Sequence, residues 1–106
     1  MKPVELFAEA EAEIGEIVDW YAERSPAAAA RFIDDLQHVL SRIPERPLAF
    51  PVITHTTTEL AIRRARCADF PYGVIYAERD ESILVVAVVH LKRRPLYWIE
   101  RLGQVQ

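Results

Sequence analysis

The stretch Ile83-Leu84-Val85-Val86-Ala87-Val88-Val89-His90-Leu91 is the strongest indication of the fold in this chain. Its first seven residues are all apolar and mostly β-branched. A continuous apolar run of this length predicts a central β-strand that is covered on both faces of its sheet. A pair of helices earlier in the chain is expected to cover one face. The other face requires either the chain's own C-terminus or another protein.

Two further strands are expected just before this one. Residues 70–79 are rich in aromatic and β-branched side chains, and residues 60–67 mix leucine, isoleucine, alanine and arginine. The short polar segment Asp80-Glu81-Ser82 predicts a tight hairpin between the last two strands. Residues 44–58 contain three prolines and three consecutive threonines, which predicts a loop.

Helical spacing predicts two helices upstream of the sheet. Apolar side chains at positions 14, 17, 18 and 21 share one helix face, which predicts a helix over residues 8–24. Ser25 and Pro26 are a cap and a first-turn residue for a second helix over residues 26–43, which Pro44 is expected to end. The short connection predicts an antiparallel helical hairpin.

These elements predict one α+β domain over residues 1–106. A short first strand within residues 2–7 precedes the helical hairpin, and a three-stranded antiparallel sheet follows it. A chain of 106 residues suits a single hydrophobic core. The longest apolar run has seven residues and no secretory leader is evident, so we expect a cytoplasmic protein with no membrane segment.

Composition excludes several classes of site. The single cysteine, Cys67, rules out an intrachain disulfide, and the three histidines share no ligand spacing with it. Three scattered glycines do not form a phosphate-binding loop. We therefore expect neither a metal ion nor a cofactor. The acidic residues of the first helix are most simply a solvated face.

Charge is unevenly distributed along the chain. The net charge is -3, but residues 1–62 carry 11 acidic and 5 basic side chains, whereas residues 63–106 carry 5 acidic and 8 basic ones. The chain as a whole is therefore not a nucleic-acid binder by composition. A basic patch in its second half is suited to a polyanion or to an acidic partner.

The basic side chains concentrate after the central strand, in the stretch 90–98, which also holds Tyr97 and Trp98. This stretch either forms a binding surface or simply caps the core, and the two alternatives are evenly balanced. On the strand over residues 60–67, alternation places Arg64 and Arg66 on one face and Arg63 on the other. These arginines either extend the basic surface or, slightly favoured, pair with acids on a neighbouring strand such as Glu78.

The element order and several sequence stretches resemble the RelE/ParE toxin superfamily of type II toxin–antitoxin systems. The resemblance covers nearly the whole chain and rests on the order and spacing of its stretches. These are Glu9 to Ile14, Asp19-Trp20-Tyr21, Glu23-Arg24-Ser25-Pro26, Arg64 to Arg66, Phe70 to Tyr76, Val86 to His90, Arg93-Arg94-Pro95 and Tyr97-Trp98.

The resemblance implies a small toxin that a cognate antitoxin protein neutralises, causing growth arrest when free. RelE-like members of the superfamily cleave mRNA on the ribosome, whereas ParE-like members poison DNA gyrase. Gly73 stands where the nuclease branch commonly has an arginine, and Ala61-Ile62-Arg63-Arg64 replaces its lysine-rich strand. A net charge of -3 also disfavours binding through phosphates. The Asp-Trp-Tyr and Phe-Pro-Tyr-Gly stretches look more like ParE-related chains, often labelled plasmid-stabilisation proteins.

The most consistent interpretation is a gyrase inhibitor that acts by protein–protein contact and reaches DNA only through its antitoxin. We expect no catalytic residue; a ribosome-dependent nuclease and a non-toxic antitoxin-binding module stay open as alternatives. His90 is more consistent with a structural residue than with a general base. The expected target-binding residues are Lys92, Arg93, Arg94, Tyr97 and Trp98; the expected antitoxin-binding residues are Ile17, Trp20, Tyr21, Leu36, Val39 and Leu40; the nuclease alternative would use Arg64, Arg66, His90, Arg93 and Tyr97.

Overall fold

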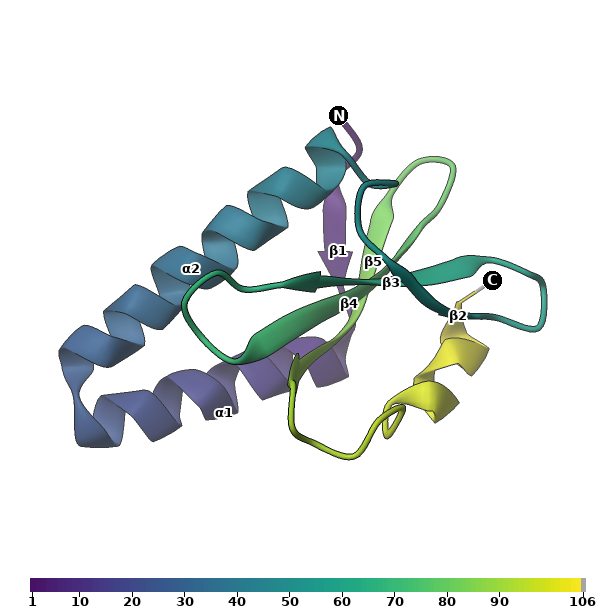
Figure 1. Ribbon diagram of the computed structural model, residues 1–106. Coiled ribbons are helices and arrows are strands. Elements are labelled where there is room, and N and C mark those ends of the chain that lie inside the picture. The colour runs from purple at the N-terminus through teal and green to yellow at the C-terminus, as the bar shows by residue number, and fades with distance from the viewer. Residues whose placement is uncertain (106) are drawn as a thin grey trace.

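A computed structural model describes residues 1–105 and confirms the α+β class (Figure 1). The element order is a strand, two helices, four strands and a final 3₁₀ helix. Among residues 1–105, no helix is long and apolar enough to cross a membrane. The elements are β1 (Val4–Leu6), α1 (Ala8–Arg24), α2 (Pro26–Glu45), β2 (Val52–His55), β3 (Ala61–Arg66), β4 (Tyr72–Glu78), β5 (Ile83–His90) and η1 (Ile99–Gln104).

The sheet has five strands in the order β1-β5-β4-β3-β2 and is therefore larger than the predicted three-stranded sheet. β3, β4 and β5 form the predicted antiparallel core. β1 adds to β5 in parallel, and β2 adds to β3 in antiparallel orientation. The prediction of a continuous loop over residues 44–58 was wrong, because β2 lies within it. Its prolines all precede the strand, so the strand can pair with β3 from Val52 to His55, with one register shift between Val52 and Thr54.

The two helices cover one face of the sheet. Ser25 caps α2, accepting a hydrogen bond from the Ala28 N–H at 3.2 Å, with Pro26 in the first turn as predicted. Pro44 does not end α2, which continues to Glu45. Because Pro44 lies in the last turn, its missing N–H costs one helical hydrogen bond, and the Arg46 N–H still donates to the Arg42 carbonyl at 3.1 Å.

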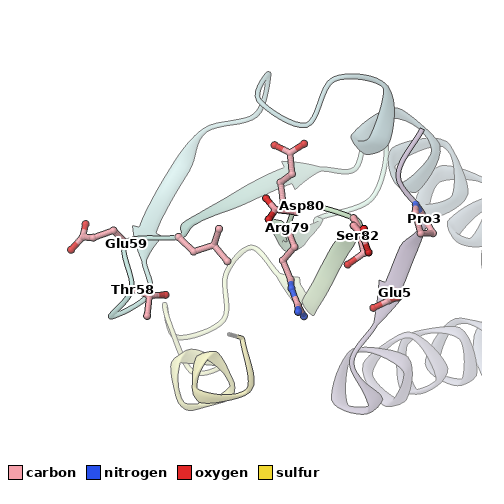
Figure 2. Close-up of a pocket in the computed structure, with 10 residues that line it drawn as sticks. Pro3, Glu5, Thr58, Glu59, Arg79, Asp80 and Ser82 are labelled. Atoms are coloured by element: carbon pink, nitrogen blue, oxygen red, sulfur yellow. The ribbon is translucent and has the colours of Figure 1, made fainter.

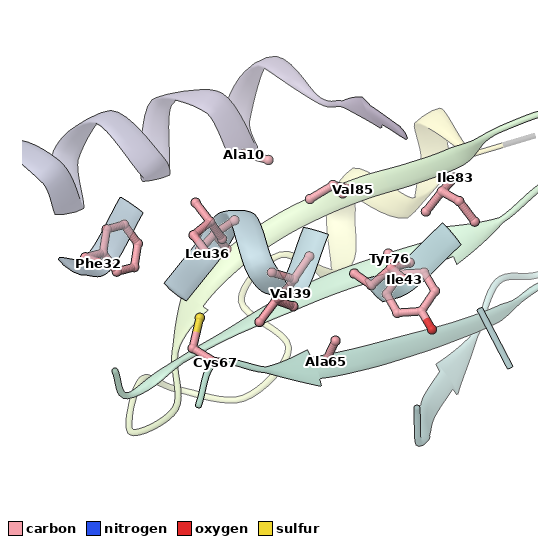
Figure 3. Packing of buried hydrophobic residues seen from close by; sticks show 12 residues of the cluster. Ala10, Phe32, Leu36, Val39, Ile43, Ala65, Cys67, Tyr76, Ile83 and Val85 are labelled. Carbon is pink, nitrogen blue, oxygen red and sulfur yellow. The ribbon is translucent and has the colours of Figure 1, made fainter. Parts of the chain in front are cut away.

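The core lies between α2 and the central strands. Figure 3 shows Phe32, Leu36, Val39 and Ile43 on α2 facing the sheet, with Ala10 of α1 beside them. Four α2 side chains at intervals of three and four residues form one buried stripe, as the helical spacing predicts. Burial of this stripe fixes α2 on the sheet.

The chain's own C-terminal segment covers the opposite face of the sheet. Trp98 and Val105 are buried there against β3, β4 and β5, and Tyr97 and Leu102 pack beside them. In Figure 1 the yellow C-terminal turns lie across the sheet from the two helices. β5 is thus buried on both faces without a partner chain. Of the two alternatives left open by the sequence, coverage by the C-terminus is the one observed.

One buried carboxylate holds the turn between β3 and β4. Asp35 of α2 accepts hydrogen bonds from three consecutive backbone N–H groups, those of Ala68, Asp69 and Phe70, each at 2.9 Å. Three donors satisfy a charged group that would otherwise be costly to bury. The contact ties α2 to the end of the sheet that carries β5's C-terminus.

Candidate functional site

The predicted site begins where β5 ends, and its geometry depends on Glu13 of α1. The Glu13 side chain is buried between α1 and β5, and its two oxygens accept hydrogen bonds from three residues. The Val88 N–H donates at 3.1 Å, and the Arg101 guanidinium donates at 2.8 Å and 3.1 Å. The Tyr97 hydroxyl donates to the second oxygen. Glu13 therefore joins α1, β5 and the C-terminal segment.

The burial of Glu13 contradicts the expectation that the acidic residues of the first helix form a solvated face. The sequence contained a signal for this, because position 13 lies three residues after Ala10 and four before Ile17, within the apolar stripe of α1. A carboxylate in such a stripe requires buried donors. Those donors come from residues 75 to 88 positions away, which helical spacing does not show.

Glu13 and Arg101 also satisfy the edge of β5. β1 pairs only with Ile83 to Val85, so β5 continues beyond the end of its neighbour. The Val88 N–H meets the Glu13 carboxylate, and the Val86 carbonyl accepts from Arg101 at 3.2 Å. Two side chains thus replace the missing strand, which keeps this sheet edge closed.

Tyr97 is fixed as a hydrogen-bond donor. Burial raises the pKa of its hydroxyl, and the hydrogen bond to Glu13 raises it further. The hydrogen bond to Glu13 raises the pKa of Arg101. At neutral pH the Tyr97 hydroxyl therefore keeps its proton and directs it at Glu13, which opposes the proton-transfer role of the nuclease alternative.

Tyr97 in turn positions Arg93. The Arg93 guanidinium carbon lies 3.8 Å from the centre of the Tyr97 ring, the geometry of a cation–π contact. Because Glu13 fixes the Tyr97 hydroxyl, the ring is a rigid platform for this cation. The sequence predicted both side chains at the site, but it did not predict that one supports the other.

A groove of about 300 Å³ lies on this face of the sheet, between β3 and the segment that follows β5. Its charged lining is basic: Arg64, Arg93 and Arg94 contribute, and none of its lining residues is acidic. Of the predicted target-binding residues, Lys92, Arg93 and Arg94 are exposed, and Tyr97 is half-buried. Trp98 is only 3% exposed and packs in the core, although it lines the floor of this groove.

The three arginines of β3 divide between the two faces of the sheet. Arg64 and Arg66 lie on the face opposite the helices and Arg63 on the helix face, as predicted. The suggested pairing with Glu78 was wrong: Arg63 donates to the carbonyls of Leu48 and Phe50, and Lys2 pairs with Glu78 at 3.0 Å.

His90 has a structural environment, in line with the favoured interpretation. Its Nδ1 atom accepts a hydrogen bond from the Lys92 N–H at 3.1 Å. Its ring packs edge-on against Tyr72, with ring centres 5.1 Å apart. Both contacts hold the chain as it leaves β5, so His90 shapes the start of the basic segment.

The predicted antitoxin-binding residues do not all reach the surface. Trp20 is 51% exposed on α1, and Ile17 and Tyr21 lie beside it along a groove of about 350 Å³. Leu36 and Val39 are each only 4% exposed and belong to the core, and Leu40 is half-buried against it. Helical spacing identified these α2 residues as one apolar face, but that face packs on the sheet.

A second hollow lies at the opposite end of the sheet, beside the β4–β5 hairpin, and its lining is mainly acidic. Figure 2 shows Glu5 and Glu59 on opposite sides of it, with Arg79 between them. Its carboxylates therefore do not converge on one point. The two ends of the sheet thus differ in charge, with the arginine groove at one end and this acidic hollow at the other.

Comparison with known proteins identifies the class to which this fold belongs. A solved chain of the chromosomal ParDE TA system from P. aeruginosa has a TM-score of 0.69 and 14% sequence identity, covering 87% of this chain and 98% of that one. This likeness shows a shared fold. No curated protein gives a significant sequence match.

The family model for the ParE toxin of the type II toxin–antitoxin system, parDE, matches residues 4–95. The chain therefore belongs to the ParE toxin family, which confirms the ParE-like resemblance of the sequence. Membership in a toxin–antitoxin family implies an antitoxin protein as the partner of this chain. The match ends at Pro95, so Tyr97 and Arg101, which bind Glu13, lie beyond it.

The first prediction concerns the Glu13 cluster. Glu13→Ala leaves the Arg101 charge and the Val88 N–H without their acceptor, and we expect it to lower the free energy of unfolding by about 3–5 kcal/mol. Urea denaturation followed by circular dichroism measures this value. Glu11→Ala, at an exposed position on the same helix, is the control and should change it by less than about 0.5 kcal/mol. Equal losses in the two variants would contradict the role given to Glu13.

The second prediction is a pH dependence. Because the folded-state pKa of Tyr97 is raised, the unfolded chain loses this proton first, near pH 10. The stability from this group is present below about pH 10 and is lost as pH rises through the folded-state pKa. Tyr72 and Tyr76, whose pKa values burial raises to about 12, act in the same direction.

We therefore expect the free energy of unfolding to fall steeply above about pH 10, where unfolded tyrosines ionise. Tyr97→Phe lacks one of the ionising groups and should lose less stability between pH 10 and 12 than the unmodified chain. Urea titrations at several pH values test this. If the free energy of unfolding falls equally with pH in the two proteins, then Tyr97 ionises equally easily in the folded and the unfolded state, which contradicts this prediction.

Proposed function

We propose that this ParE-family toxin inhibits DNA gyrase by protein–protein contact. The contact surface is the basic segment that follows β5, formed by Lys92, Arg93 and Arg94 with Tyr97 beneath them. The main support is the family match, combined with exposed cations on a segment that Glu13 and Tyr97 hold rigidly. A rigid, exposed arginine cluster suits the recognition of an acidic protein surface.

The Tyr97 hydroxyl is the observation that favours inhibition by contact over RNA cleavage. An mRNA nuclease of the alternative type would use this hydroxyl, or His90, to move protons. Tyr97 is instead bound to Glu13, and His90 accepts the Lys92 N–H. The basic groups that remain can bind an anion through charged hydrogen bonds.

We further propose that the cognate antitoxin neutralises the toxin by covering the α1 groove beside Trp20, and that the pair acts in the cytoplasm. Trp20 is exposed there, and the half-buried Ile17, Tyr21 and Tyr72 line the groove beside it. An amphipathic segment of the antitoxin is suited to such a groove. Trp20 is the expected anchor, because large aromatic side chains carry much of the affinity of protein interfaces.

The direct test of the target is a supercoiling assay with purified gyrase and the toxin free of antitoxin. We expect a dose-dependent loss of supercoiling with trapped, cleaved DNA. Arg93→Gln combined with Arg94→Gln should raise the concentration for half-inhibition about tenfold or more, because two charged contacts are lost. Arg31→Gln with Arg46→Gln removes the same charge from exposed positions on and beside α2 and should have little effect.

Two outcomes would contradict this proposal. If a large molar excess of folded toxin leaves supercoiling intact, gyrase is not the target, and translation-dependent mRNA cleavage then separates a nuclease from a non-toxic module. If both arginine pairs reduce inhibition equally, the effect reflects net charge and not the basic segment.

The antitoxin proposal makes a separate prediction. Trp20→Glu places a charge in the α1 groove, and we expect growth arrest to persist when this variant is co-expressed with the module's antitoxin. Ile33→Glu changes an exposed apolar residue on α2 and should remain neutralised. Growth on solid medium with and without the antitoxin measures both. Full neutralisation of Trp20→Glu would place the antitoxin elsewhere.

A further inference from the structure

Arg64 belongs to the groove behind the basic segment, although it lies about thirty positions earlier in the sequence. It lines the same 300 Å³ space as Arg93 and Arg94. The sequence left open whether Arg64 extends the basic surface or pairs with an acid, and it named Arg64 as a site residue only for the nuclease alternative. The groove therefore has three arginines from two separate segments.

Gly73 of β4 determines the path of the Arg64 side chain. A Cβ atom at Gly73 would lie 3.1 Å from Arg64 Cγ, 3.2 Å from Arg64 Cδ and 3.3 Å from Leu91 Cδ2. These distances are shorter than ordinary carbon–carbon contacts. The absence of a side chain at Gly73 thus lets the Arg64 methylenes cross the neighbouring strand and lie beside Leu91, where the basic segment begins.

Within the described residues 1–105, none of the three arginines forms an ion pair with a carboxylate. Among residues 1–105, Arg64 and Arg94 have no acidic partner, and Arg93 is held by the Tyr97 ring and not by a carboxylate. Like charges in one groove repel one another, and the repulsion is relieved when an anion enters. The planar guanidinium group matches the geometry of both carboxylates and phosphates, so charge alone does not identify the ligand.

The apolar lining favours a peptide over a nucleic acid. Ile53, Ile75, Val89 and Leu96 line the same groove as the arginines. These side chains suit the entry of an aliphatic side chain, and they offer nothing to a phosphate. The chain as a whole is acidic, with a net charge of -3, which disfavours a long polyanion.

We infer that the groove binds an acidic segment of the protein target, with carboxylates on Arg64, Arg93 and Arg94 and an aliphatic side chain between them. Gly73 is a positioning residue that acts through Arg64. This inference rests on the proposed function, because it names the chemistry of the partner that the same surface takes.

The first experiment measures peptide binding to the full-length toxin by ¹⁵N chemical-shift titration. The probe is an acetylated and amidated peptide, Glu-Asp-Leu-Glu-Glu, and the matched control peptide is Gln-Asn-Leu-Gln-Gln. We expect the acidic peptide to shift signals of the groove and the control peptide to bind at least about tenfold more weakly, since charged hydrogen bonds are lost. The oligonucleotide hexathymidylate is titrated in parallel.

Variants then test the two new residues. Arg64→Ala should weaken peptide binding about tenfold, whereas Arg66→Ala, on the same strand and face but outside the groove, should not. Gly73→Ala should also weaken binding severalfold without loss of stability, since alanine is no worse than glycine in a strand. Gly15→Ala, where a Cβ meets nothing within 4 Å, is its control.

A double variant separates positioning from a general structural effect. If Gly73 acts through Arg64, Gly73→Ala should change peptide binding little in an Arg64→Ala background. An undiminished effect in that background would overturn the positioning role. So would a Gly73→Ala protein that loses binding only because it is less stable.

The remaining outcomes distinguish this inference from the proposed function. If hexathymidylate shifts the groove signals and the acidic peptide does not, or if neither ligand does, the inference is overturned. If Arg64→Ala inhibits gyrase as well as the unmodified toxin, the inference fails while the proposed function stands. If the acidic peptide binds through Arg64 but gyrase is unaffected, the groove chemistry holds and the target was misassigned.

Discussion

The carboxylate of Glu13 connects three parts of the chain that lie far apart in sequence. It accepts the Val88 N–H of the central strand, the Tyr97 hydroxyl of the basic segment and the Arg101 guanidinium of the last 3₁₀ helix. A carboxylate buried this deeply is stable only when its donors are all in place. The arrangement therefore holds the C-terminal segment on the sheet, and with it the covered face of β5.

The same constraint extends to the surface. Glu13 fixes Tyr97, and the Tyr97 ring supports Arg93. A buried acid therefore sets the position of an exposed cation that it does not touch. Gly73 likewise influences the position of Arg64, because the absence of a side chain at Gly73 leaves space for the Arg64 methylenes. Rigid arginines bind with less loss of conformational entropy than flexible ones, which suits a recognition surface.

This ParE-family toxin thus presents two grooves, and His90 lines both of them. Trp20 and its neighbours on α1 line one groove, and the three arginines together with apolar side chains line the other. Two distinct surfaces on so small a domain are compatible with two different partners. Leu36 and Val39, which the sequence assigned to antitoxin binding, are buried between α2 and the sheet.

Periodicity, caps and charge runs are local signals, and they were enough to predict the α+β class, both helices, the three central strands and the concentration of cations after β5. The folded structure was needed to show what covers the second face of β5, since that depends on where the chain turns after His90. It also decided that Glu13 is buried, that Trp98 is core and that Arg64 joins Arg93. These are contacts between distant segments, and their energies arise only when packing brings the segments together.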